Sequence, residues 1–154
     1  MAGSGRGAGW VWLQFAVMGL VVAAGLVSPH WPGAAHRVLS TVGAVLAVTG
    51  VAIAVWASRQ LGRSFTPYPQ PLEAGELVER GPYRFVRHPV YSGGLVFFLG
   101  YSLFASVPAL GLTCVLAVVW ALKARVEERF LKGQYPAYEA YASRVRFRLL
   151  PYVY

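Results

Sequence analysis

The run VLSTVGAVLAVTGVAIAVWA at residues 38–57 contains no charged side chain. About 20 apolar residues suffice for a helix to cross a bilayer. Its small residues recur at spacings of three and four and therefore share one helical face, which comprises Ser40, Gly43, Ala47, Gly50, Ala54 and Ala57. Such a face lets another helix approach closely, either within the chain or in a second copy. We therefore interpret residues 38–57 as a transmembrane helix.

Three further apolar runs cover residues 10–27, 89–105 and 109–122. A signal peptide is the alternative for the first run, but its length and the tryptophans at its edge favour a retained span. Pro89 suits the first turn of a helix, and Ser106 to Pro108 predict a tight reversal. The sequence thus predicts an all-α polytopic membrane bundle of about four transmembrane helices, forming one membrane domain over residues 1–154.

The composition supports a membrane protein, because 56% of the residues are hydrophobic and only 13% are charged. The net charge is +8, but the basic residues flank the apolar runs, so we expect the lipid bilayer and not nucleic acid as the partner. The single cysteine, Cys114, lies inside an apolar run and offers neither a disulfide nor a cysteine metal site. His30 and His36 lie across the membrane from His88, so no three-ligand metal site is predicted.

Lysine and arginine concentrate in the loop at residues 58–88 and in the tail at residues 123–154, leaving only Arg6 and Arg37 elsewhere. Cytoplasmic segments carry the excess of basic residues. With four spans, both basic segments fall on one side of the membrane. We therefore predict that both termini are cytoplasmic and that the protein lies in the cytoplasmic (inner) membrane.

Two polar clusters adjoin the spans on that side. His88 directly precedes Pro89 and is predicted at the N-cap of a helix, where free N–H groups favour an anionic or electron-rich ligand; Tyr91 projects from the same face. Glu127 and Glu128 follow the fourth apolar run, on a helix that continues past it. Because neighbouring helical positions point about 100° apart, we expect at most one carboxylate to face His88 and the other to be solvated. Interfacial ion pairs without a ligand are the alternative.

These clusters form an ordered pattern that resembles the isoprenylcysteine carboxyl methyltransferase family and the related membrane phospholipid methyltransferases. The resemblance covers about half of the chain, from Arg59-Gln60-Leu61-Gly62 to the end. Tyr135-Pro136 departs from it, standing where Phe-Gly is common. The matching residues are Leu77-Val78, Gly81-Pro82-Tyr83, Arg87-His88-Pro89, Tyr91, Gly93, Glu127-Glu128, Tyr138 and Tyr141.

The resemblance implies that the cytoplasmic loop and a C-terminal helix form a pocket for S-adenosylmethionine, with a lipophilic acceptor entering from the bilayer. Arg125 or a neighbour would orient the acceptor. The cofactor-binding residues it implies are Leu77, Val78, Tyr83, His88, Pro89, Tyr91, Glu127 and Glu128. Methyl transfer from a sulfonium needs alignment more than a strong acid or base, so an active site without a catalytic triad or metal is expected.

We therefore predict an integral membrane S-adenosylmethionine-dependent methyltransferase that acts on a lipophilic or small acceptor, a carboxylate such as isoprenylcysteine being favoured over a thiol or a phospholipid amine. One alternative is a membrane sterol or steroid reductase, which would bind NADPH in the corresponding pocket, although this chain is short for that class. The other is a non-catalytic membrane scaffold, but His88, Tyr91 and Glu128 of the polar face are all present. The sequence leaves the oligomeric state open.

Overall fold

The computed structural model describes residues 7–33 and 35–151, so Arg6 and residues 152–154 of the predicted tail lie outside the described residues. Within them the chain is all-helical, as predicted. The helices are α1 (Ala8–Val27), α2 (Ala35–Leu61), η1 (Gly62–Ser64), η2 (Gly81–Arg84), α3 (Pro89–Ala105), α4 (Val107–Gln134) and α5 (Tyr138–Arg144). Helices α1, α2 and α4 are long and apolar enough to cross a membrane, and α3 is a shorter apolar helix. The protein is therefore a helical integral membrane protein.

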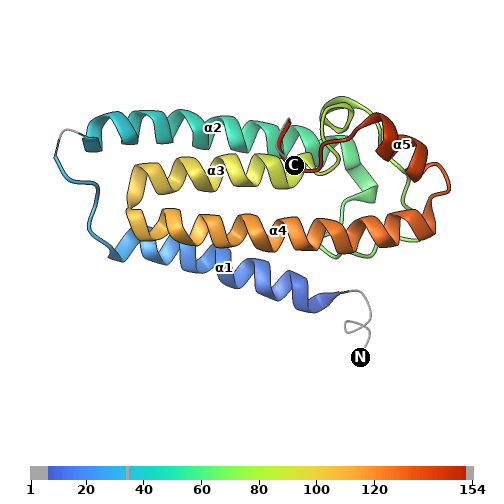
Figure 1. Cartoon of the computed structure of the whole chain (residues 1–154), viewed down its shortest axis with the longest axis horizontal. Coiled ribbons are helices and arrows are strands. Elements are labelled where there is room, and N and C mark those ends of the chain that lie inside the picture. The colour runs from blue at the N-terminus through green and yellow to red at the C-terminus, as the bar shows by residue number, and fades with distance from the viewer. Residues whose placement is uncertain (1–6, 34, 152–154) are drawn as a thin grey trace.

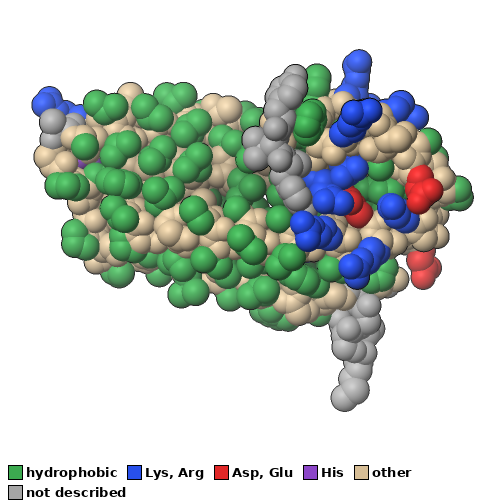
Figure 2. Space-filling view, viewed as in Figure 1, with side chains coloured by type: hydrophobic (Ala, Val, Ile, Leu, Met, Phe, Trp, Pro, Cys, Tyr) green, Lys and Arg blue, Asp and Glu red, His purple; other side chains and the backbone are tan. Residues whose placement is uncertain are grey.

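The long helices lie side by side, with α3 and α4 between α2 and α1 (Figure 1). The start of α1, the end of α2, the start of α3 and the end of α4 lie at one end of the bundle, together with α5. Most of the charged side chains in Figure 2 gather at this end, whereas hydrophobic side chains cover the body of the visible face. The end that carries α5 is called the polar end below.

The small-residue face of α2 packs against α3 within the chain. A Cβ atom on Gly43 would lie 2.5 Å from the carbonyl oxygen of Gly100, and one on Gly93 would lie 2.5 Å from the backbone nitrogen of Ala54. Side chains at these positions would collide with backbone, so the glycines allow the two helices to touch. The sequence permitted a close contact either within the chain or with a second copy, and the contact within the chain is formed.

Three of the helices, α1, α2 and α4, extend beyond the predicted spans. Helix α2 continues past residue 57 and ends at Leu61, because Arg59 lies in its last turn, where a cation is favourable, and Gly62 takes a φ of 51° that ends the helix. Helix α4 begins at Val107, directly after Ser106, whose hydroxyl accepts a hydrogen bond from the Ala109 nitrogen. It then runs to Gln134, which carries its last turns beyond the predicted span.

Residues 145–149, called the C-terminal strap below, cross the start of α3. The backbone nitrogens of Arg87 and His88 donate to the carbonyl oxygens of Phe147 and Arg148, each at 2.9 Å. The Ser92 hydroxyl donates to the carbonyl of Leu149, whose side chain is buried in the main core. The strap therefore fixes the backbone of His88 from a distant part of the sequence.

Candidate functional site

A cavity of about 460 Å³ lies at the polar end, a volume typical of cofactor and ligand sites. Its two halves differ in chemistry. The polar half is lined by residues from η2, α5 and the adjoining ends of α3 and α4, among them Tyr83, Arg87, His88, Glu127, Tyr138 and Tyr141. The apolar half lies between the membrane helices and includes Phe15, Met18, Val51, Ala54, Val55 and Phe97. One cavity thus joins a polar chamber to a hydrocarbon-like one.

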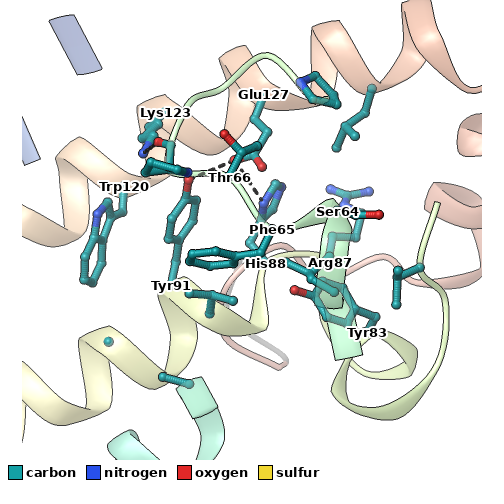
Figure 3. Close-up of a pocket in the computed structure, with 18 of the residues that line it drawn as sticks. Ser64, Phe65, Thr66, Tyr83, Arg87, His88, Tyr91, Trp120, Lys123 and Glu127 are labelled. Atoms are coloured by element: carbon teal, nitrogen blue, oxygen red, sulfur yellow. Dashed lines mark hydrogen bonds and ion pairs between the residues drawn. The ribbon is translucent and has the colours of Figure 1, made fainter. Parts of the chain in front are cut away.

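A stack of three rings links the halves (Figure 3). The His88 and Tyr91 rings are one helical turn apart, with centroids 5.6 Å apart and planes inclined by 8°. Trp120 of α4 continues the stack, 5.5 Å from Tyr91 at 14°. Such separations are those of offset aromatic stacking, so the Tyr91–Trp120 contact joins α3 to α4 in the wall of the cavity.

Both Glu127 and Glu128 face His88. The Tyr91 hydroxyl donates to Glu127 Oε2 at 2.9 Å, and His88 Nδ1 lies 3.7 Å from the same oxygen. On its other edge, His88 Nε2 lies 3.4 Å from Glu128 Oε1. The prediction that at most one carboxylate faces His88 is therefore wrong, because the two ring nitrogens lie on different edges and each reaches one of two diverging side chains.

Glu128 forms the centre of a buried ion network. Its carboxylate lies 2.9 Å from Arg87 Nε and 3.0 Å from Arg148 Nε, while its side chain is only 8% exposed. Arg148 belongs to the C-terminal strap, so the network joins α4, the start of α3 and the strap. A buried carboxylate with several cationic partners is well compensated, and Glu128 holds both Arg87 and His88 in place.

The comparison with known proteins agrees with this geometry. Residues 38–138 match the model of the phospholipid methyltransferase family. The chain belongs to this family. This match and the relatives described next confirm the resemblance seen in the sequence.

Two curated relatives of this phospholipid methyltransferase family member match parts of the chain. A probable protein-S-isoprenylcysteine O-methyltransferase of Oryza sativa, in both subspecies indica and japonica, is 33% identical over 112 residues, which is 70% of this chain and 59% of that protein. The cobalt-zinc-cadmium resistance protein CzcN of Cupriavidus metallidurans is 40% identical over 72 residues, covering 44% of this chain and 32% of that protein. The matches thus span 32% to 59% of the length of these relatives.

Most of the predicted cofactor residues of this family member line the cavity: Leu77, Val78, Tyr83, His88, Tyr91 and Glu127. Pro89 and Glu128 are buried directly behind it. Arg125, which we expected to orient the acceptor, is exposed and does not line the cavity. Lys123 and Glu127 both line the cavity. Arg125 is two positions from each of them, which places it about 200° around the helix, on the opposite side. The guanidinium that reaches the cavity is that of Arg87.

The sequence interpretation missed a polar cluster between α1 and α4. Lys123 is fully buried, and its Nζ donates to Gln14 Oε1 and to the Pro67 carbonyl oxygen, each at 2.7 Å. Trp120 Nε1 donates to the same Gln14 oxygen at 3.1 Å. Gln14 is the one amide side chain in residues 10–27. Because a polar residue inside a membrane span needs a partner, its presence could have predicted this cluster. Gln14 lies outside the segment that matches the family.

The polar half also contains two buried tyrosines from α5. The Tyr141 hydroxyl donates to the Tyr83 carbonyl oxygen at 2.8 Å, whereas the Tyr138 hydroxyl is buried with no hydrogen-bond partner in residues 7–33 and 35–151. Burial, and then the charge of Glu128, raise the pKa of Tyr138 above its ordinary value of 10.0, so it remains a neutral hydroxyl. A buried, unsatisfied hydroxyl that lines a cavity is suited to a polar ligand.

Proposed function

We propose that the protein is a membrane methyltransferase that binds S-adenosylmethionine in the polar half of the cavity and a lipophilic acceptor in the apolar half. The observation that carries this proposal is the single cavity whose halves meet at the His88–Tyr91–Trp120 stack. Membership of the methyltransferase family supports it. A polar ligand and a hydrocarbon chain that bound in the two halves would lie within reach of each other.

The polar half fits the cofactor in the chemistry of its donors and acceptors. The Tyr138 hydroxyl is unsatisfied among the described residues, and the Glu127 carboxylate suits a cationic or hydroxyl-bearing group. When bound, S-adenosylmethionine supplies an activated methyl group on a sulfonium. The residues that we propose to contact it are Leu77, Val78, Tyr83, His88, Tyr91, Glu127 and Tyr138.

The remaining predicted residues act from behind the cavity in this proposal. Glu128 positions His88 and Arg87 through contacts of 3.4 and 2.9 Å. Pro89 begins α3 and fixes where His88 ends the preceding loop. This machinery aligns two ligands and excludes water, which is the main requirement for transfer of an activated group.

For the acceptor we propose a carboxylate on an apolar chain, such as isoprenylcysteine. A carboxylate accepts a methyl group without losing a proton, so no residue has to act as a base. An amine must release a proton, and a thiol must be ionised first. The apolar half, between α1, α2 and α3, has the lining that an isoprenoid or acyl chain requires.

We also propose that the whole chain is one domain of the cytoplasmic (inner) membrane with both termini cytoplasmic. The gathering of basic side chains at the polar end supports this orientation (Figure 2). The cofactor would then enter from the cytoplasm.

The test is binding of S-adenosylmethionine to the purified protein by calorimetry, with NADPH titrated separately. We expect saturable binding of the first ligand only, and a loss of at least about ten-fold in affinity for His88→Ala, since its ring lies between both carboxylates. Arg125→Ala is the matched control and should bind like wild type, because this residue is exposed outside the cavity. Saturable NADPH binding without S-adenosylmethionine binding would establish the reductase alternative instead.

A further inference from the structure

The side chain of Lys123 is a buried charge whose hydrogen-bond partners are neutral. It is 0% exposed, and its two hydrogen bonds go to an amide oxygen and a backbone carbonyl. Its Nζ lies 5.4 Å from the centroid of the Tyr91 ring. None of the ion pairs within the described residues, 7–33 and 35–151, involves Lys123.

This arrangement contrasts with that of the other cations near the cavity. Arg87 and Arg148 share Glu128, and Glu127 contacts Tyr91 and His88. Buried charges are normally paired, because burial without a counter-charge is costly. Glu127, one helical turn further along α4, acts on the Lys123 ammonium only at longer range, so no carboxylate lies within ion-pair distance and an anionic ligand at the cavity would supply a direct counter-charge.

The position of Lys123 shows which ligand that charge serves. Its contacts are Gln14 on α1, Pro67 on the loop and the Tyr91 ring, all at the junction where the polar half meets the apolar half. An acceptor whose chain lies in the apolar half would bring its polar head to this junction. In a low-dielectric wall, the field of an ammonium acts over several ångströms without direct contact.

We propose that Lys123, held in place by Gln14, is a positioning residue whose charge selects acceptors with an anionic head over those with an amine. The proposal rests on the function proposed above. It gives α1 a specific role although this helix lies outside the segment matched by the family. Gln14 Oε1 receives hydrogen bonds from both Lys123 and Trp120, so it fixes the ammonium relative to the ring stack.

The experiment measures binding of two probes with the same hydrocarbon chain, tetradecanoate and tetradecylamine, to full-length protein loaded with S-adenosylhomocysteine. We expect wild type to bind tetradecanoate about ten-fold or more tightly than the amine. Methyl transfer from labelled S-adenosylmethionine to each probe is the second measurement.

Two variants test the charge separately from the fold. Lys123→Met removes the charge at similar length and should weaken tetradecanoate by about ten-fold while leaving the amine within about two-fold. Gln14→Glu keeps an oxygen that can accept from Lys123 and Trp120, and its carboxylate balances the charge of the ammonium. It should therefore also lower the preference for tetradecanoate over tetradecylamine, with the fold retained. Leu13→Ala, on the neighbouring exposed position of α1, is the control and should leave the ratio unchanged.

The outcomes separate the proposals. Equal weakening of both probes in the two variants would show a structural role alone and overturn the inference. A loss of S-adenosylhomocysteine affinity in Lys123→Met, with tetradecanoate unaffected, would assign the charge to the cofactor and also overturn it. Failure of wild type to prefer tetradecanoate, including failure to bind either probe, overturns it while leaving the methyltransferase proposal intact. Failure of wild type to bind S-adenosylhomocysteine would instead refute the proposed function.

Discussion

The two halves of the cavity are held together by different forces. In the polar half, Glu128 gathers Arg87, His88 and Arg148 into one buried network. In the apolar half, backbone-to-backbone packing of α2 on α3 sets the shape, and the adjacent charge, Lys123, has neutral partners. The difference teaches that the polar half pairs its buried arginines with a carboxylate of the chain, whereas the ammonium beside the apolar half has no carboxylate within ion-pair distance.

The largest effect is expected from breaking the network of the polar half. Glu128→Ala leaves the buried Arg87 without its carboxylate and removes one of the two carboxylates at His88. Breaking a buried pair typically costs about 3–5 kcal/mol, so methyl transfer should be abolished and the unfolding midpoint should fall. Glu139→Ala is the control, because its pair with Lys132 is exposed and worth at most about 1 kcal/mol. Equal thermal stability of the two variants would contradict this account of the network.

A smaller effect is expected from the helix contact that shapes the apolar half. Gly93→Ala puts a Cβ atom 2.5 Å from the backbone nitrogen of Ala54, and overpacking of this kind costs about 1–3 kcal/mol. Gly19→Ala on α1 meets nothing within 4 Å and should be neutral or slightly stabilising. Denaturant or thermal unfolding in micelles measures both, and destabilisation of Gly19→Ala alone would reverse the assignment.

The smallest effects are expected from removing one hydroxyl group in the polar half, where loss of ligand binding can be distinguished from loss of stability. Tyr138→Phe should leave stability unchanged, since its hydroxyl has no partner among the described residues, but should weaken S-adenosylmethionine by about 1 kcal/mol. Tyr141→Phe should instead lower stability by about 1 kcal/mol, because its hydroxyl bonds the Tyr83 carbonyl. Calorimetric binding and thermal unfolding of the two variants give the comparison, and the reverse pattern would show that Tyr138 faces no ligand.

The sequence was sufficient for the helices and for several residues that line the cavity. Apolar runs predicted the membrane helices because a bilayer demands continuous apolar length. The spacing of His88 and Tyr91 placed them on one helical face, and the stacked rings follow from it. The resemblance then identified six residues that line the cavity.

The remaining contacts depend on long-range packing that local patterns do not encode. Gln14 and Lys123 are separated by 109 residues, and only the docking of α1 on α4 makes them partners. Helix geometry alone suggested that Glu127 and Glu128 diverge, but it did not include a ring placed between them. The resemblance suggested Arg125 or a neighbour as the acceptor residue, but a family pattern does not fix the phase of α4, and Arg125 is exposed outside the cavity.

The C-terminal strap has a consequence for the order in which the protein is made. Its carbonyl groups hold the backbone of Arg87 and His88, and its Arg148 completes the ion network. All four long helices are synthesised before residues 145–149. Membrane insertion of the bundle can therefore precede assembly of the polar half. A nascent chain whose residues 145–149 are still inside the ribosome would have its membrane helices but an incomplete polar half.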